Sequence, residues 1–143
     1  MPFSDLFAAS AISGTGLSAE RYRMEVIANN IANANSTKSA NGGPYRRQDV
    51  VFAEVLGGMG AGGVPAFGGV QAVELIEDPT EFPQVYMPGH PEADAEGMVT
   101  MPNVNLPFEM VNLLTASRAY EANLRASQTF RTMNEQALIL IRG

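Results

Sequence analysis

A chain of 143 residues is long enough for one ordinary domain, and an apolar content of 45% is enough to build a core. All nine cations lie before residue 48 or after residue 109, whereas residues 48–108 carry nine carboxylates, so the net charge of -6 comes from the middle of the chain. This distribution argues against nucleic-acid binding, which needs a basic patch. The absence of cysteine excludes disulfides and thiolate metal sites.

The start of the chain, MPFSDLFAAS, has no basic segment before an apolar one, so we expect no cleavable signal peptide. No apolar run reaches the roughly 18 residues that a helix needs to cross a bilayer, so we expect no direct insertion into a membrane. The protein therefore either stays inside the cell or leaves it by a route that does not read such a signal.

The first predicted element is a long helix from Ser4 to about Ala32. Ser4 is a suitable N-cap, and Asp5 is well placed at the positive end of the helix dipole. One apolar stripe along this helix consists of Leu17, Met24, Ile27 and Ile31. The pattern fits an ordinary amphipathic core helix as well as it fits a surface that packs against another subunit.

The end of this helix, residues 28–37, reads ANNIANANST and is rich in asparagine. Asparagine is a poor helix former that bridges backbone groups well, so we expect this segment to close the helix and bind the chain beside it. A chance polar turn is the alternative. In the functional interpretation Ile31 and Ala32 point inward, and buried backbone groups are bound by the asparagines, which are Asn29, Asn30 and Asn33.

The middle of the chain, residues 38–104, is expected to form an acidic, β-rich insertion of short strands and loops. Residues that favour β structure predict extended segments at 45–56, 70–76 and 84–87. Between them, residues 57–69 contain seven glycines and predict a flexible linker or the tip of a hairpin. This stretch lacks the Lys-Ser/Thr ending of a phosphate-binding loop and a dinucleotide-binding fingerprint.

Residues His90, Glu92, Asp94 and Glu96 resemble the first half of a calcium-binding loop. The glutamate expected at the twelfth position is missing, because Asn103 stands there, so a solvated acidic turn is the better interpretation. With one histidine, no cysteine and no nucleophile elbow, the sequence favours neither a catalytic triad nor any other enzyme. We expect no cofactor.

The last quarter of the chain, residues 106–142, predicts a second long helix, because no Gly or Pro follows Pro107. At about 1.5 Å per residue it would reach roughly 55 Å, which exceeds the helices of most compact domains. Asn105 is a suitable N-cap, and Glu109 lies near the positive end of the helix dipole.

The apolar residues of this helix lie on two sides. One predicted seam consists of Leu106, Met110, Leu113, Ser117, Tyr120 and Leu124. The second consists of Ala119, Ala122, Ala126, Phe130, Met133, Ala137 and Leu140. A single neighbouring helix covers only one seam, so we expect the other to face a different part of the fold or another chain.

These elements predict a mainly α protein with a small β-rich insertion. The terminal segments, residues 1–37 and 105–143, would pack as a coiled-coil-like pair of long helices around the insertion at 38–104. The residues that we expect at an assembly interface are Leu17, Met24, Ile27, Asn29, Asn30, Ile31, Asn33, Met110, Leu113, Tyr120, Leu124, Phe130, Met133 and Leu140.

Short motifs occur in a fixed order along nearly the whole chain. They are Ala28–Asn33 (ANNIAN), Gly42–Arg47 (GGPYRR), Pro88–Pro91 (PGHP), Pro102–Asn105 (PNVN), Glu109–Val111 (EMV) and Ser117–Asn123 (SRAYEAN). In these motifs the chain resembles the flagellar basal-body rod proteins, and among them the FlgC family of the proximal rod.

The resemblance implies a structural subunit of the hollow rod that crosses the periplasm and carries torque. Its partners would be other copies of itself, other rod proteins, and the flagellar export apparatus, through which it would pass without a cleavable signal. The terminal helices would pack in the inner tube, with the middle of the chain outside. A self-contained dimeric helical binding module is the alternative that the residue pattern leaves open.

Overall fold

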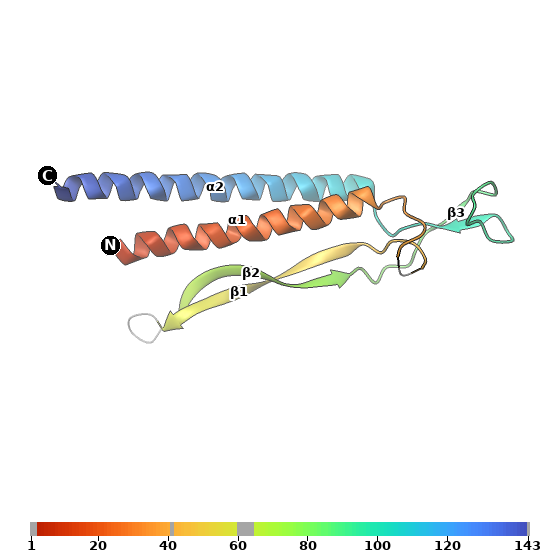
Figure 1. The fold of residues 1–143 in the computed structure, drawn as a ribbon, viewed down its shortest axis with the longest axis horizontal. Helices are drawn as coiled ribbons and strands as arrows, with labels where there is room; N and C mark the ends of the chain where they lie inside the picture. The colour runs from red at the N-terminus through yellow and green to blue at the C-terminus, as the bar shows by residue number, and fades with distance from the viewer. Residues whose placement is uncertain (1–2, 41, 60–64, 143) are drawn as a thin grey trace.

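Two long helices lie side by side and run antiparallel, and the segment that holds strand β3 (Gln84–Tyr86) extends beyond them (Figure 1). The computed structural model describes residues 3–40, 42–59 and 65–142. Helix α1 spans Phe3–Ala32 and helix α2 spans Leu106–Arg142, so both predicted helices are confirmed to within one residue. The Asn105 side chain accepts a hydrogen bond from the backbone N–H of Phe108 at 3.3 Å, which confirms it as the N-cap of α2.

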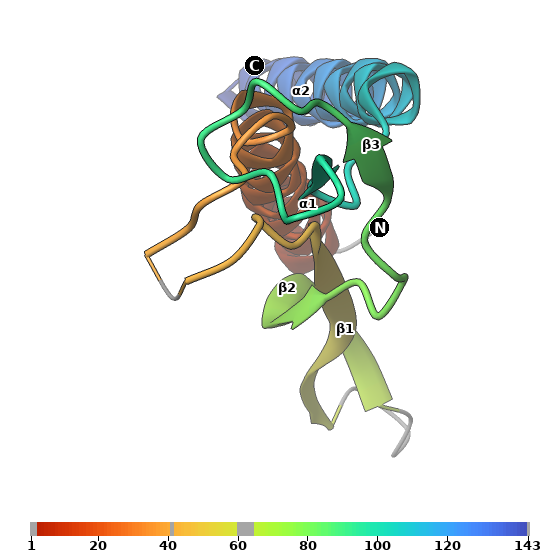
Figure 2. The same ribbon diagram turned by 90° about the vertical axis from the view of Figure 1, so that its right-hand side faces the viewer.

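A β-hairpin lies against α1 on the side opposite to α2 (Figures 1 and 2). Strand β1 (Gln48–Met59) pairs antiparallel with β2 (Pro65–Glu77), and the register shifts at several points along the pair. Shifts of this kind mark β-bulges, which bend and twist a ribbon. The three layers are therefore α2, α1 and the hairpin.

A second small sheet lies at the end of the molecule away from the two termini (Figure 1). It pairs β3 (Gln84–Tyr86) with β4 (Met98–Thr100) in antiparallel register. The sequence predicted the first of these strands but not the second. At three residues, β4 is too short for its alternation to be recognised in a sequence.

The prediction of short strands with a loop over residues 57–69 is wrong in its bounds. Strand β1 continues to Met59, and β2 begins at Pro65, so glycines from both sides of the stretch belong to the hairpin. Residues 60–64 lie outside the described part of the chain. Pairing to a partner strand satisfies the glycine backbone groups, which overrides the low β-propensity of glycine.

The apolar core of the described residues is small and built mostly from small side chains. Buried apolar residues gather along α1, just after it, at β4 and in α2; they are Ala19, Val26, Ile27, Ala34, Val99 and Ala116. A core of this size removes little apolar surface from water, so the fold gains only modest stability from burial.

The hairpin is fastened to α1 at Thr15. The Thr15 hydroxyl accepts a hydrogen bond from the backbone N–H of Val70 at 3.1 Å and donates one to the Ile12 carbonyl at 2.7 Å. Gly69 has a φ of +111°, and a Cβ atom placed there would collide with the Thr15 side chain. Only glycine permits both this backbone conformation and this close approach.

Replacing Gly69 with alanine should therefore loosen the hairpin from α1. We expect Gly69→Ala to lower the free energy of unfolding by at least about 1–2 kcal/mol, because the positive φ alone penalises a Cβ atom by that amount. Urea unfolding and hydrogen exchange of the hairpin amides measure the effect. Gly58→Ala, where a Cβ atom meets open space, is the matched control. Equal stability of the two variants would contradict the proposal that the Gly69–Thr15 contact holds the hairpin against α1.

Candidate assembly interface

A buried polar network joins the start of α2 to the end of α1 and the start of β1. At its centre is Glu109, whose side chain is only 1% exposed although it carries a charge. One Glu109 oxygen accepts a hydrogen bond from Arg47 Nε at 2.8 Å, and the other accepts one from Asn30 Nδ2 at 3.1 Å. Each carboxylate oxygen thus has a donor, which is the condition for burying a charge.

Asn30 extends this network to the backbone of β1. Its amide nitrogen donates to the carbonyl of Gln48 at 2.8 Å, and its carbonyl oxygen accepts from the N–H of Gln48 at 3.0 Å and from the Tyr45 hydroxyl at 2.9 Å. Asn30 is completely buried. The Asn30 side chain therefore fixes the start of β1 relative to the end of α1.

Arg47 also faces two further carboxylates. Its guanidinium lies 3.3 Å from Asp49 and 3.4 Å from Asp78, and its backbone N–H donates to the Asn103 side chain at 2.7 Å. Asn103 in turn donates to the carbonyl of Asp78 at 3.1 Å. Asn103, which lies before α2, is thereby bound to the residue that precedes β1 and to the residue that follows β2.

The electrostatics of this junction shift three pKa values. Burial lowers the pKa of Arg47, but its hydrogen bond to Glu109 and the nearby carboxylates outweigh burial and raise it overall. Burial raises the pKa of Tyr45, and the negative charge of Glu109 adds to this rise. Hydrogen bonds from Thr80 lower the pKa of Asp78, and Arg47 lowers it further. The arginine therefore stays charged and the tyrosine neutral.

The sequence singled out three asparagines near this junction, and the structure separates their roles. Asn30 does bind buried backbone, as predicted. Asn33 instead donates at the surface to the carbonyl and side-chain oxygens of Asn29, both at 2.9 Å. Ala32 is exposed, so the expectation that it points inward is wrong. The helix axis places residues 30 and 32 about 200° apart, so both cannot face the same neighbour.

Tyr45, Arg47, Asn103 and Glu109 formed no part of the predicted interface, although all four lie in the motifs that the sequence analysis quoted. The structure brings these separated motifs together at one place. Glu109 was missed because a charged residue on a predicted helix is usually solvated, and the other three were missed because they lie outside both helices, where no periodic pattern marks burial. The available signal was the clustering of Arg, Tyr and Asn in short motifs.

The face of α2 that packs toward α1 is small and polar. Its less exposed residues include Glu109, Asn112, Ala116, Asn123, Ser127, Phe130, Asn134 and Ala137, and at neighbouring positions Leu106, Leu113, Ser117, Ala119, Tyr120 and Ala126 are half-buried too. Ala116 is completely buried, and at Gly16 a Cβ atom would come within 3.0 Å of the Asn123 amide. Burial on α2 follows neither predicted seam alone, since half-buried members come from both, namely Leu106, Leu113, Ser117 and Tyr120 from the first and Ala119, Ala126, Phe130 and Ala137 from the second.

The residues expected at an assembly interface differ widely in exposure. Ile27 and Asn30 are buried within the chain itself. Half-buried are Leu17, Met24, Ile31, Asn33, Leu113, Tyr120 and Phe130. Exposed are Asn29, Met110, Leu124, Met133 and Leu140.

Large apolar side chains of α2 are exposed toward both of its ends. Near its start these are Phe108, Met110, Val111 and Leu114, and toward its end they are Leu124, Met133, Leu138, Ile139 and Leu140. Leu140 is 83% exposed and Ile139 70%. Apolar side chains gathered in this way on one helix are typical of a surface that packs against another chain.

The acidic segment after β3 forms a closed turn. Asp94 accepts hydrogen bonds from the backbone N–H groups of Glu96 and Met98, and His90 Nδ1 accepts one from the N–H of Glu92. In the described part of the chain, no three His, Asp or Glu side chains converge on a point that could hold a metal ion. Nor is any described helix both long and apolar enough to cross a membrane.

Two long terminal helices with exposed apolar ends, held together by a buried polar junction, define an elongated assembly subunit. Two family models match the chain: "Flagella basal body rod protein" over residues 11–38 and "Flagellar basal body rod FlgEFG protein C-terminal" over residues 95–140. The first match includes α1 from residue 11 onward, and the second includes α2 up to residue 140.

Curated proteins give a closer match. The chain is similar to the flagellar basal-body rod protein FlgC of Borreliella burgdorferi, with 37% identity over 96% of this chain and 99% of that protein. It is 43% identical to FlgC of Escherichia coli O6:H1, over 90% and 92% of the two chains. The FlgC protein of Bacillus subtilis is 38% identical over 89% and 92%. The chain belongs to the FlgC family of flagellar basal-body rod proteins.

Breaking the buried ion pair should be costly. We expect Arg47→Ala to lower the free energy of unfolding by roughly 3–5 kcal/mol, because it leaves the buried Glu109 carboxylate without its cation. Glu109→Ala should cost less, because Arg47 keeps Asp49 and Asp78 as partners. The control is Arg131→Ala, since Arg131 and Glu135 are paired on the surface with side chains 82% and 62% exposed. That loss should stay within about 0.5 kcal/mol. Denaturant titration measures the free energy of unfolding of the three variants. An equal loss in all three would refute the central role of Glu109.

The lowered pKa of Asp78 predicts sensitivity to acid. Because the pKa of this group is lower in the fold than its ordinary value of 3.8, its stabilising effect is present above that value and is lost as pH falls through the folded pKa. The Asp78→Asn variant should therefore lose less stability than the wild type as the pH falls below about 4. Urea midpoints measured from pH 7 down to pH 2 test this, and parallel curves for the two proteins would contradict it.

Proposed function

We propose that this protein is a structural subunit of the bacterial flagellar rod and has no enzymatic role. Its terminal helices pack against other copies of itself and against other rod proteins, and together they form a hollow helical tube that transmits torque. Family membership supports this proposal, and the observation that carries it is the exposed apolar surface on α2. Heterologous contacts of one subunit with the next generate such a tube.

The physical basis of assembly is the burial of apolar surface that the lone chain leaves in water. Among the α2 side chains that the structure describes, nine large apolar ones are exposed in the free chain. Each one that a neighbour buries fully contributes about 1.5–3 kcal/mol, so a few such contacts per subunit are enough to hold a subunit in place. The helix face toward α1 is already occupied, so these contacts must be made with other chains.

The interface in this proposal uses the helical segments 1–37 and 105–143, with the insertion 38–104 directed away from the contacts. Leu17, Met24, Leu124, Met133 and Leu140 would be among the contact residues, and the helices would pack with the spacing of a coiled coil once neighbours surround them. The concentration of carboxylates in residues 48–108 supports this division, because like charges repel within a tightly packed tube.

We further propose that the chain reaches the periplasmic rod through the flagellar export apparatus, without a cleavable signal peptide. The small apolar core and the absence of cysteine support passage in an unfolded form, since little stability has to be overcome and no disulfide resists unfolding. Assembly then supplies the stability that the free chain lacks.

Leu140→Glu tests the proposed function directly. Because this side chain is 83% exposed, the variant should fold like the wild type by circular dichroism, yet it should fail to enter rods and leave cells non-motile. The host is a motile bacterium in which this chain replaces the resident FlgC protein. The measurements are swimming and the amount of the chain in purified basal bodies.

Gln136→Glu is the matched control, since it adds the same charge at an exposed position one turn earlier on α2. It should swim normally. Normal swimming of Leu140→Glu would overturn the proposal. A purified wild-type chain that forms a closed dimer and never grows further with rod proteins would instead favour a self-contained dimeric helical module.

A further inference from the structure

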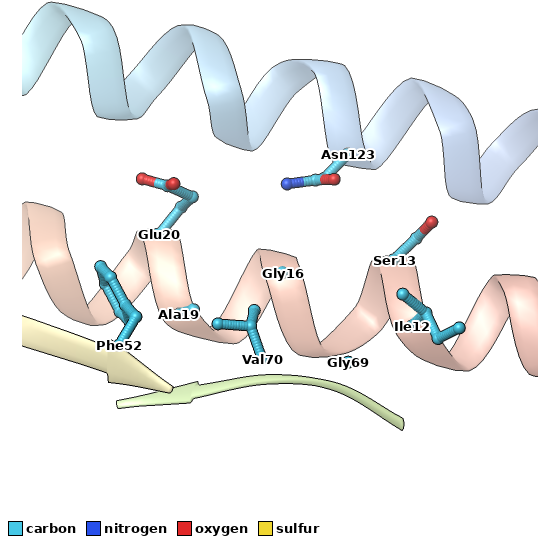
Figure 3. A pocket seen from close by; sticks show the side chains of 9 residues that line it. All are labelled: Ile12, Ser13, Gly16, Ala19, Glu20, Phe52, Gly69, Val70 and Asn123. Carbon is cyan, nitrogen blue, oxygen red and sulfur yellow. The ribbon is translucent and has the colours of Figure 1, made fainter. Parts of the chain in front are cut away.

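A groove opens between all three layers of the fold near the middle of α1 (Figure 3). Its volume is about 390 Å³. The walls toward the hairpin are apolar and come from Ile12, Ala19, Phe52 and Val70, whereas polar side chains come from α1 and α2 on the other side. This side of the groove carries Ser13, Glu20 and Asn123, which Figure 3 shows between the two helices.

The groove is lined by Glu20, whose carboxylate has one oxygen without a hydrogen-bond donor. Glu20 Oε2 is buried and unpartnered, and the Glu20 side chain as a whole is only 20% exposed. Arg23 Nη1 lies 4.0 Å away, which is close enough for an electrostatic attraction but too long for a hydrogen bond. A buried acceptor without a donor costs free energy, and more so when it is charged.

The Asn123 side chain lies close to α1 one turn before Glu20. A Cβ atom at Gly16 would come within 3.0 Å of the Asn123 amide nitrogen, so this amide lies against the backbone of α1. Further along the same face of α2, Asn134 Oδ1 is also buried without a donor. Asn134 follows Asn123 by nearly three whole helical turns, so both point to the same side. Both unpartnered atoms are acceptors.

An arginine side chain has the properties that this groove requires. Its guanidinium donates five hydrogen bonds and accepts none, and its aliphatic stem packs against apolar walls. Eight of the nine cations of this chain are arginine. Several arginines are exposed on the helices, with side-chain exposures of 73% for Arg21, 80% for Arg125 and 82% for Arg131, and Arg118 is exposed as well.

We propose that this groove receives an exposed arginine from a helix of a second copy, whose guanidinium binds Glu20. The inference rests on the proposed function; it names a specific contact and adds the hairpin wall of the groove to the helical contacts. The two halves of the contact lie in different places on the chain, the carboxylate in a groove and the cation on an outer face. One copy can therefore bind the next without closing a symmetric dimer, as a growing tube requires.

Charge reversal tests this contact in cells that carry the chain as their only FlgC protein. Glu20→Arg should lower the amount of the chain in purified basal bodies by roughly tenfold or more, since a hydrogen bond to a charged group is lost and two cations now face each other. Changing one of the four arginines to glutamate in the same chain, Arg21, Arg118, Arg125 or Arg131, should restore it. Glu96→Arg, an equal charge change on the exposed turn after β3, should have no effect.

Disulfide cross-linking tests whether Glu20 of one copy and the arginine of the next lie close together. Because the natural chain has no cysteine, Glu20→Cys combined with a cysteine at the rescuing arginine should give chains linked to one another in oxidised basal bodies. Glu20→Gln, which keeps the shape and removes the charge, should reduce rod incorporation less severely than Glu20→Arg. Circular dichroism of each purified variant excludes loss of folding.

The outcomes separate this inference from the proposed function. Rescue by one arginine reversal, together with the disulfide, supports the contact. Normal incorporation of Glu20→Arg overturns it, and so does a defect that none of the four reversals repairs, because water or Arg23 of the same chain would then satisfy Glu20. In either of those cases the rod function stands as long as the wild type enters basal bodies.

Discussion

The structure depends on one buried charge, the carboxylate of Glu109, and on the donors that surround it. Arg47 and Asn30 each bind one of its oxygens, and through them the start of α2 is joined to the start of β1 and the end of α1. A buried ion pair of this kind adds little net stability, but it permits only one arrangement, since any shift leaves a charge unpaired. The junction therefore fixes the arrangement of α1, α2 and β1 more than it adds to the stability of the fold.

This arrangement suits a protein that is stiff within an assembly and only marginally stable as a free chain. The polar junction holds one end of the helix pair, and small residues along the α1–α2 face bring the helices close without a large core. Apolar side chains that would fill the core of an independent domain are instead exposed on α2. The free chain thus has a defined shape but leaves most of its potential apolar burial to its neighbours.

Much of the architecture follows from local patterns along the chain. The second helix and its Asn105 cap follow from a long stretch without Gly or Pro and from a preferred capping residue, whereas the first helix follows from its apolar stripe despite Gly14 and Gly16. The hairpin was only partly foreseen, because its strands extend into the glycine-rich stretch once pairing satisfies their backbone groups. The bonds of Asn30 and Glu109 could not be foreseen, since they join residues 79 positions apart.

The sequence by itself determined that two long helices enclose an acidic insertion and that the apolar surface of the second helix exceeds what one neighbour can cover. Periodicity, capping and charge distribution are local properties, so they can be read without coordinates. Only the tertiary structure decided which face of α2 meets α1, which asparagine is buried, and that Glu20 lies in a groove without a donor. These depend on how closely two backbones approach, and that distance is set by contacts between residues far apart in the chain.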